Sequence, residues 1–487
     1  MKLTRKQINI LLILAVLTVV LFIGIFFLPH ITGGSSVEPD PPPVIVPPAH
    51  DRFRHPREAA SEHLSWELTL GGTGNEQVVA AFGLGEELII FGNTTSTDFD
   101  FDGTNANAAG SFFVMLLNLN GQPIAYRAHA GTLEQVIMIS NPREGFLLVV
   151  NTATESFIIE TNLFATDLLE GDKRRSDCLR NAAHERIVYL YIDDFALYGD
   201  RTPAHLPREI YHAVLEAVDV LDGFRRLRVA VLCASLEVQY ERFFTSTQSV
   251  EFVAAYAKLG EFVLFGTLIG GNNTSRLVGF RWDRVAPTRS FTPLLMQGVQ
   301  NYSLQGMIPV GADEFAALIR LPTGVHQIVW FYNFFSATPR IHTIELSGES
   351  AQKAVILGGG QNRFYVFEID LLGNGILYRF SISTMRILDE MPLVEFNYLT
   401  TLTAHLPTNA GHGTVFIGTT ATHTVIIGTD SMGTTNTRLI EGIKNVRFII
   451  RENENIGGVI IVGEIEESSP NAYQHFGGSD VWIARVG

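Results

Sequence analysis

From residue 64 to its end, the chain repeats short apolar runs that are separated by Gly, Asn, Asp, Ser and Thr. The clearest runs end in glycine and lie at residues 88–92, 262–266, 414–418 and 459–463. Short apolar runs bounded by turn residues predict buried β-strands, and no helical period of any length competes with them. Weaker runs without the glycine fill the intervals, so that the runs begin about 50 residues apart.

A period of this length, with room for several strands in each unit, predicts the blades of an all-β propeller. We expect eight four-stranded blades, or seven if the irregular stretch 163–248 holds one blade and an insertion. Two stacked β-sandwiches are the alternative, although sandwiches do not need a repeat that continues to the last residue.

The two ends of this region predict how the ring closes. The region begins with an apolar strand at 64–70, and the chain finishes in another at 480–486. If the N- and C-terminal strands pair in one blade, the ring has no open edge that could promote aggregation.

Residues 10–28 are an almost unbroken apolar run, preceded by Lys2, Arg5 and Lys6. As a helix this run is roughly 28 Å long, which matches the hydrocarbon core of a bilayer. The basic residues predict a single-pass transmembrane helix in the cell membrane, with a cytoplasmic N-terminus and an extracytoplasmic body. A cleaved signal peptide is the alternative, because small residues at 33–36 would allow cleavage.

The chain therefore divides into three predicted parts. Residues 1–30 form a cytoplasmic tip and the transmembrane anchor, and residues 63–487 form the propeller. Between them, residues 31–62 contain a proline-rich linker, which we expect to be an extended spacer.

Composition narrows the classes of partner. Hydrophobic residues make up 46% of the chain, which is enough for a large core, whereas charged residues make up only 17%. The net charge of −15 argues against nucleic-acid binding, which requires Lys and Arg to replace counterions. The two cysteines, Cys178 and Cys233, exclude a disulfide framework and leave a single bridge as an open question.

Several segments match a repeat family. They are Trp66, the turn 71–75 (GGTGN), the run 88–92, the segment 96–99 (STDF), the strand 111–115 (SFFVM) and the strand 478–485 (GSDVWIAR). Together they resemble the bacterial seven-bladed β-propeller repeat family (SBBP-type repeats), over about residues 64–125 and 457–487. The resemblance implies a closed propeller of seven blades that acts as a binding or scaffold module, without shared catalytic residues.

One loop has the pattern of a calcium site. Asp98, Asp100 and Asp102 alternate and are followed by Gly103. Alternate carboxylates before a sharp turn provide the oxygen ligands that Ca²⁺ prefers. Ala109 stands where an EF-hand would have its bidentate Glu, so an EF-hand is not expected. The alternative is a solvated acidic loop, and we expect no other cofactor.

No P-loop, nucleophile elbow or paired-histidine metal motif occurs. The basic residues Arg225, Arg226 and Arg228 are expected to neutralise nearby acids. We predict a membrane-anchored, extracytoplasmic binding or scaffold module for a protein or glycan partner. The alternative is a cell-surface polysaccharide hydrolase or lyase with its site at the propeller channel.

Overall fold

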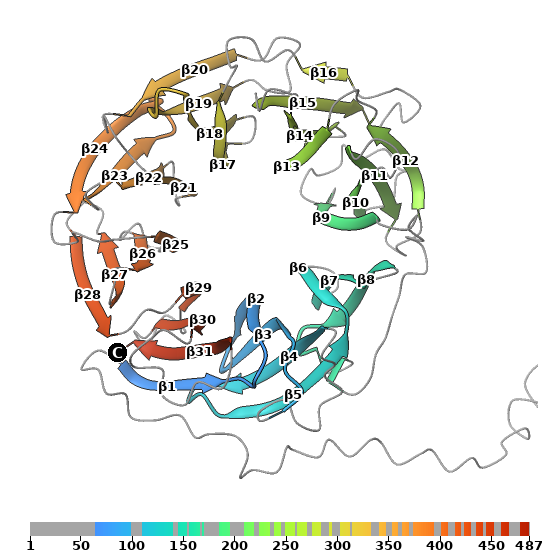
Figure 1. The fold of residues 1–487 in the computed structure, drawn as a ribbon, viewed down its shortest axis with the longest axis vertical. Helices are drawn as coiled ribbons and strands as arrows, with labels where there is room; N and C mark the ends of the chain where they lie inside the picture. The colour runs from blue at the N-terminus through green and yellow to red at the C-terminus, as the bar shows by residue number, and fades with distance from the viewer. Residues whose placement is uncertain are drawn as a thin grey trace, which may run out of the picture. The chain divides into compact units, whose positions relative to one another are not determined.

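A computed structural model describes residues 64–98 and 110–139 and, with gaps, much of the chain from 145 to 486. All of these residues belong to a unit that spans Pro47–Gly487. They form 31 β-strands, which pair into seven sheets of four strands and one sheet of three strands (Figure 1). The predicted all-β class is therefore confirmed.

In the first half of the ring, each sheet is given from its innermost strand outward (Figure 1). The first sheet consists of β2 (Glu76–Leu84), β3 (Glu87–Thr94), β4 (Ser111–Asn118) and β5 (Pro123–Ala130). The second consists of β6 (Thr132–Ile139), β7 (Gly145–Asn151) and β8 (Ser156–Asn162). The third consists of β9 (Glu185–Asp194), β10 (Glu209–Val218), β11 (Arg225–Cys233) and β12 (Val238–Phe244). The fourth consists of β13 (Ser249–Lys258), β14 (Glu261–Ile269), β15 (Ser275–Asp283) and β16 (Thr292–Leu294).

The remaining sheets follow the same order. The fifth consists of β17 (Ser303–Gly311), β18 (Glu314–Arg320), β19 (His326–Tyr332) and β20 (Arg340–Glu345). The sixth consists of β21 (Lys353–Gly358), β22 (Arg363–Ile369), β23 (Gly375–Ser381) and β24 (Arg386–Leu393). Next come β25 (Thr401–Pro407), β26 (Thr414–Thr419), β27 (His423–Thr429) and β28 (Thr435–Glu441). The closing sheet consists of β29 (Asn445–Arg451), β30 (Val459–Glu466), β31 (Ser479–Val486) and β1 (Leu64–Leu70).

Each sheet contacts the next along the chain, and the closing sheet contacts β2, so the sheets form a complete β-propeller ring (Figure 1). The expectation of eight four-stranded blades is corrected, because seven blades have four strands and the sheet of β6, β7 and β8 has three in the described residues. After β8 the described residues Ala165 and Leu168 are buried in the core between the first two sheets, and neither belongs to a strand. The stretch 163–248 contributes the blade β9–β12.

The predicted closure of the ring is confirmed. β1 and β31 pair in antiparallel register, with Thr69 opposite Trp482 and Trp66 opposite Arg485. The indole Nε1 of Trp482 also donates a hydrogen bond to the Glu67 carboxylate at 3.2 Å. The first strand of the region is therefore the outermost strand of its last blade.

The core lies between neighbouring sheets, and this explains why the second strands are continuous apolar runs. In β3, Leu88 and Ile90 pack toward the closing sheet, whereas Ile89 and Phe91 pack toward the sheet of β6–β8. The rings of Phe91 and Phe146 meet edge-on across that second interface, at 5.1 Å between centroids. A strand that is buried on both faces has no reason to alternate apolar and polar residues.

The repeated glycine lies opposite a β-bulge in the innermost strand. In the first sheet Val78 pairs with Gly92 and Ala80 with Phe91, which leaves Val79 as an extra residue. A Cβ at Gly92 would lie 2.5 Å from the carbonyl oxygen of Gln77, so a side chain has no room there. Seven sheets show the same shift, and their extra residues are Val79, Glu134, Val188, Val253, Gln305, Thr403 and Arg447.

The residue that follows the glycine position of a second strand can hydrogen-bond to the innermost strand of the next blade. Asn93 donates to the carbonyl oxygen of Leu133 at 3.0 Å and accepts from its N–H at 2.7 Å. Asn151 makes the same two contacts with Ile187, at 3.0 and 3.2 Å. Leu133 and Ile187 each directly precede a bulge, where strand pairing is interrupted and backbone groups need other partners.

Glu464 completes this series across the closed ring, because it accepts a hydrogen bond from the Val78 N–H at 2.9 Å. Val78 also precedes a bulge. We call Asn93, Asn151 and Glu464 the clasp residues.

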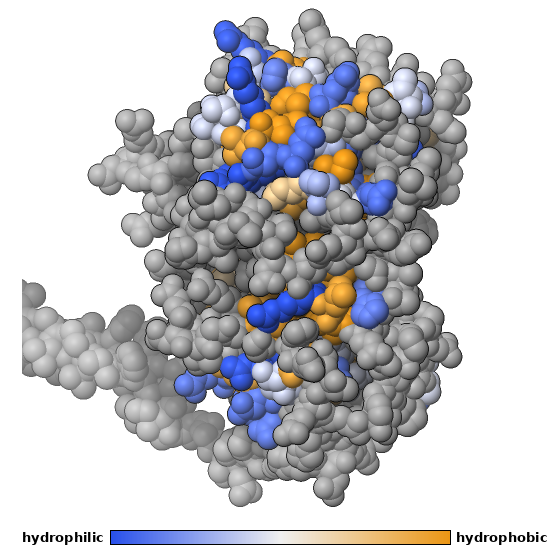
Figure 2. All heavy atoms as spheres, turned by 90° about the vertical axis from the view of Figure 1, so that its left-hand side faces the viewer, coloured by the Kyte–Doolittle hydropathy of each residue, from blue (hydrophilic) through white to orange (hydrophobic). Residues whose placement is uncertain are grey.

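The outermost strands β24 and β28 each expose a large hydrophobic side chain. Leu388 on β24 and Leu439 on β28 are exposed at 45% and 46%, and hydrophilic residues lie between the hydrophobic patches on this side (Figure 2). Charged residues such as Arg386 and Glu390 share β24 with Leu388. Charges on an edge strand oppose pairing with another molecule.

The predicted anchor at 10–28 and linker at 31–62 lie outside the described residues, as does Cys178. Within the part of the chain that the structure describes, no helix is long and apolar enough to cross a membrane.

Candidate functional site on the innermost strands

A polar position recurs two residues before each of the seven extra residues named above. The seven residues at this position are Gln77, Thr132, Arg186, Glu251, Ser303, Thr401 and Asn445. An apolar residue always lies between this position and the bulge, as at Val78, Ile187 and Val446, which are buried. We call the seven polar residues the polar rim.

Most of the polar rim is open to solvent. Five of its members are exposed, namely Gln77, Thr132, Arg186, Glu251 and Ser303, and Asn445 is half-buried. The bulge adds further exposed polar side chains two residues later, at Glu134, Gln305 and Arg447. Amide, hydroxyl, guanidinium and carboxylate groups together supply both donors and acceptors of hydrogen bonds. Because successive blades carry the rim at equivalent positions, a partner can contact several blades at once.

The other ends of the innermost strands differ in polarity. Phe82, Ile308 and Ile450 are half-buried there, and Met138 is exposed at 46%. Apolar side chains therefore lie toward the C-terminal ends of β2, β6, β17 and β29.

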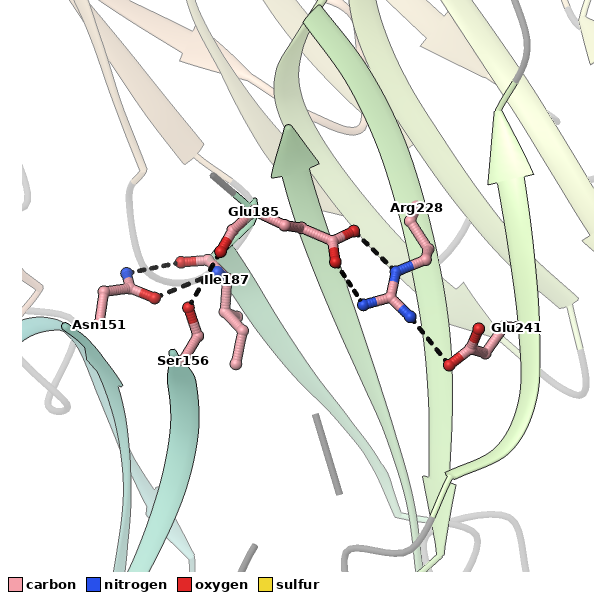
Figure 3. Close-up of polar contacts among 6 residues, drawn as sticks. All are labelled: Asn151, Ser156, Glu185, Ile187, Arg228 and Glu241. Atoms are coloured by element: carbon pink, nitrogen blue, oxygen red, sulfur yellow. Dashed lines mark hydrogen bonds and ion pairs between the residues drawn. The ribbon is translucent and has the colours of Figure 1, made fainter. Parts of the chain in front are cut away.

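Arg186 of the rim follows a residue that is held by a buried ion pair (Figure 3). Glu185 accepts hydrogen bonds from Nε and Nη2 of Arg228 at 2.7 and 2.6 Å, and Nη1 donates to Glu241 at 2.8 Å. Burial lowers the pKa of Arg228, but its hydrogen bonds and attraction to Glu185 and Glu241 outweigh burial and raise that pKa. The guanidinium therefore stays charged, and it fixes the start of β9.

The residue after Arg186 is held as well. Ile187 is bound by the Asn151 clasp, and the Ser156 hydroxyl lies 3.5 Å from the carbonyl oxygen of Glu185 (Figure 3). The backbone of Arg186 is thus fixed on both sides.

Glu251 of the rim is paired across two blades. Nη1 of Arg225 lies 3.0 Å from Glu251 on β13 and 3.2 Å from Glu216 on β10. Together with the ion pairs of Arg228, this contact confirms that basic residues of the 225–228 cluster neutralise nearby acids.

A second polar cluster lies where the ring closes. Glu76 accepts hydrogen bonds at Oε1 from the hydroxyls of Ser96 and Thr94, at 2.5 and 2.8 Å. The Gly72 N–H lies 3.3 Å from Oε2. Burial raises the pKa of Glu76 to about 7; the three hydrogen bonds oppose this shift, and the charge of Asp480 adds to it. The GGTGN turn and the STDF segment therefore meet around one buried carboxyl group.

The predicted calcium ligands are only partly described. Asp98 accepts hydrogen bonds from the N–H and the hydroxyl of Thr73, at 2.9 and 2.8 Å. Asp100 and Asp102 lie outside the described residues. Among the residues that the structure describes, no group of three or more His, Cys, Asp or Glu could hold a metal, so the calcium site stays a prediction.

Sequence reasoning did not find the polar rim. Its signal is a polar residue followed by an apolar one at the start of each innermost strand. That short pattern becomes visible only when the sequences of the innermost strands are aligned on their bulges.

No family model and no curated protein matches the chain. Among solved structures it is similar to the Dos1 propeller, with a TM-score of 0.46 and 9% identity, over 85% of this chain and 95% of that chain. It is similar to Sqt1 from Saccharomyces cerevisiae, with a TM-score of 0.44 and 11% identity, over 86% of this chain and 99% of the other. A puromycin-hydrolyzing peptidase from Mycobacterium tuberculosis gives a TM-score of 0.43 and 11% identity, over 82% of this chain and 60% of the peptidase.

Proposed function

We propose that the ring is a non-catalytic binding or scaffold module, and that its polar rim recognises a protein or glycan partner. The observation that carries the proposal is the polar position that recurs before the bulges and is exposed in five blades. A repeated, exposed set of donors and acceptors on a rigid scaffold suits a partner that spans several blades.

The fixed geometry of the rim supports this proposal. Arg186 lies between two anchored residues, and Glu251 is held by Arg225 at 3.0 Å. A backbone and a carboxylate that are already fixed lose little freedom on binding, so more of the interaction energy contributes to affinity.

We further propose that residues 10–28 anchor the ring to a bacterial cell membrane and that the linker 31–62 presents it outside the cell. The apolar run and the basic residues before it support this topology. The net charge of −15 supports a partner other than nucleic acid.

A polysaccharide hydrolase or lyase would need acid and base groups that face a substrate, as two carboxyl groups do in glycosidases. Glu76 has the raised pKa of a general acid, but it is 1% exposed and bonded within the ring closure. The exposed carboxylates Glu134 and Glu251 instead contact Asn151 and Arg225, at 3.4 and 3.0 Å. We therefore propose binding in preference to catalysis.

The test uses the full-length protein in detergent micelles, applied to an oligosaccharide array and to a peptide display library. A rim variant combines Gln77→Ala, Arg186→Ala and Glu251→Ala. The matched control removes three exposed polar side chains of the outermost strand β20, with Arg340→Ala, His342→Ala and Thr343→Ala.

We expect the rim variant to bind each positive ligand at least about tenfold more weakly, a loss of roughly 1.4 kcal/mol or more. The β20 variant should bind as the wild type does. Ligands that bind the folded rim variant with unchanged Kd would contradict the proposal.

A further inference from the structure

The ring closes where the start of β31 contacts the residues around the start of β2. We call this junction, between residues 74–76 and 478–480, the seam. The Gly478 N–H donates to the carbonyl oxygen of Gly74 at 2.9 Å, and Asn75 and Ser479 form a parallel bridge. The Ser479 hydroxyl donates to the carbonyl oxygen of Glu76 at 2.7 Å. β31 is therefore held by β1 along its length and by residues 74–76 at its start.

Two carboxyl groups are buried at this seam. Glu76 is 1% exposed and Asp480 is fully buried. A Cβ at Gly71 would lie 1.8 Å from Oδ1 of Asp480, so the Asp480 carboxyl packs directly on the backbone of the GGTGN turn. The donors to Glu76 are two hydroxyls and one backbone amide, none of which carries a positive charge. Like charges in one buried cluster resist ionising together.

Two further carboxylates, Glu464 and Asp98, lie near the seam. On β30, Glu464 is bound to the Val78 N–H at 2.9 Å and to Arg447 of β29 at 3.3 Å, so the guanidinium of Arg447 is engaged by a carboxylate other than Glu76. In the loop after β3, Asp98 is bound by Thr73 and adds a further negative charge.

We propose that the seam is an acid-strengthened latch, in which a proton on Glu76 tightens the junction between β31 and the first blade and loss of that proton loosens it. The latch lies directly beside the rim residue Gln77 and the clasp between Glu464 and Val78. Loosening the seam therefore changes the geometry of the ring where its last and first blades meet. This inference is independent of the proposed function.

The sign of the effect follows from proton linkage. When the seam is closed, the pKa of Glu76 is about 7. When β31 separates from residues 74–76 and the seam opens, the carboxyl group has its ordinary pKa of 4.5. Below pH 4.5 the group is protonated in both states, and the seam has its full strength. Between pH 4.5 and about 7 the open state loses its proton first, so the seam weakens as the pH rises. Above that range the difference is constant.

Hydrogen exchange of the full-length protein, followed by mass spectrometry between pH 4.5 and 8, tests the latch. Protection factors, corrected for the intrinsic pH dependence of exchange, are compared for seam peptides 64–84 and 478–486 and for the control peptide 314–332. We expect seam protection to fall with rising pH, by up to about 300-fold, the limit that a shift from 4.5 to about 7 sets. The control peptide should show a much smaller change.

Glu76→Gln keeps the size of the side chain but cannot titrate. We expect its seam protection to be independent of pH and close to the wild-type value at pH 4.5. Glu134→Gln, at an exposed carboxylate of β6, should keep the wild-type pH profile. A flat wild-type seam, or a Glu76→Gln seam that still weakens with pH, would overturn the proposal. If Glu76→Gln does not fold, the comparison of seam and control peptides in the wild type decides.

Discussion

The clasp between blades makes a quantitative prediction for Asn93→Leu. This change keeps the approximate size of the side chain but removes both hydrogen bonds to Leu133, at 3.0 and 2.7 Å. Leu133 is 2% exposed and precedes a bulge, so its N–H and C=O have no water to replace the lost partner. An unsatisfied buried polar group costs about 1–3 kcal/mol, so we expect the free energy of unfolding to fall by about 2–5 kcal/mol.

Two further variants separate the clasp from other effects of residue 93. Asn93→Asp keeps the oxygen that accepts from the Leu133 N–H but loses the donor to the carbonyl oxygen. Its second carboxylate oxygen then faces the Leu133 carbonyl oxygen, so we expect a cost of at least about 1–3 kcal/mol. Gln77→Leu is the control, because Gln77 pairs with Asn93 in the same sheet but is exposed. Its effect should stay within about 0.5 kcal/mol.

Urea unfolding of the three variants and the wild type, followed by far-ultraviolet circular dichroism, measures these differences as shifts in midpoint at constant slope. The reasoning would be refuted if Asn93→Leu unfolded within about 0.5 kcal/mol of the wild type, or if Gln77→Leu were as destabilised as Asn93→Leu.

Two other predictions concern buried charge and bound metal. Arg228→Met leaves Glu185, whose side chain is 7% exposed, without its cation, and should cost about 3–5 kcal/mol in the same urea assay. The double variant Arg228→Met/Glu185→Gln should recover part of that loss. Equal destabilisation of the single and double variants would count against the buried pair. If Asp98, Asp100 and Asp102 hold Ca²⁺, excess chelator should lower the Tm of the wild type but not of Asp100→Asn/Asp102→Asn, whereas an unchanged wild-type Tm would remove the site.

The parts of the fold that follow from burial were predictable. Runs such as 88–92 are apolar because both faces of β3 are covered, and such runs identify second strands by composition alone. The pairing of β1 with β31 was predictable too, because a strand at each end of the region leaves two edges that can satisfy each other. The sheet of β6, β7 and β8 was less predictable, since Ala165 and Leu168 fill core volume without belonging to a strand.

The candidate site was harder to predict, because the sequence pattern does not separate a turn-capping carboxylate from a calcium ligand and does not show where a bulge occurs. Asp98 has the alternation of a calcium ligand, yet in the structure its oxygens accept from Thr73. A carboxylate that caps a turn and one that binds a cation can share the same local sequence. The rim was missed for a different reason. A bulge shifts the facing of every later residue by one position, and simple alternation does not reveal where the shift occurs.

The rim residue, the residue bound by a clasp and the bulge occupy consecutive places in the chain, and this would couple the proposed binding at the rim to ring stability. On β9, Arg186 belongs to the rim, Ile187 is held by Asn151 of the preceding blade, and Val188 is the bulge. The same order is found on β2, where Gln77 precedes Val78, the residue bound by Glu464. A partner that contacts the rim of several blades therefore also restrains the contacts between them. By mass action such a partner would stabilise the assembled ring, and weakening one clasp would weaken the proposed binding at the rim residue beside it.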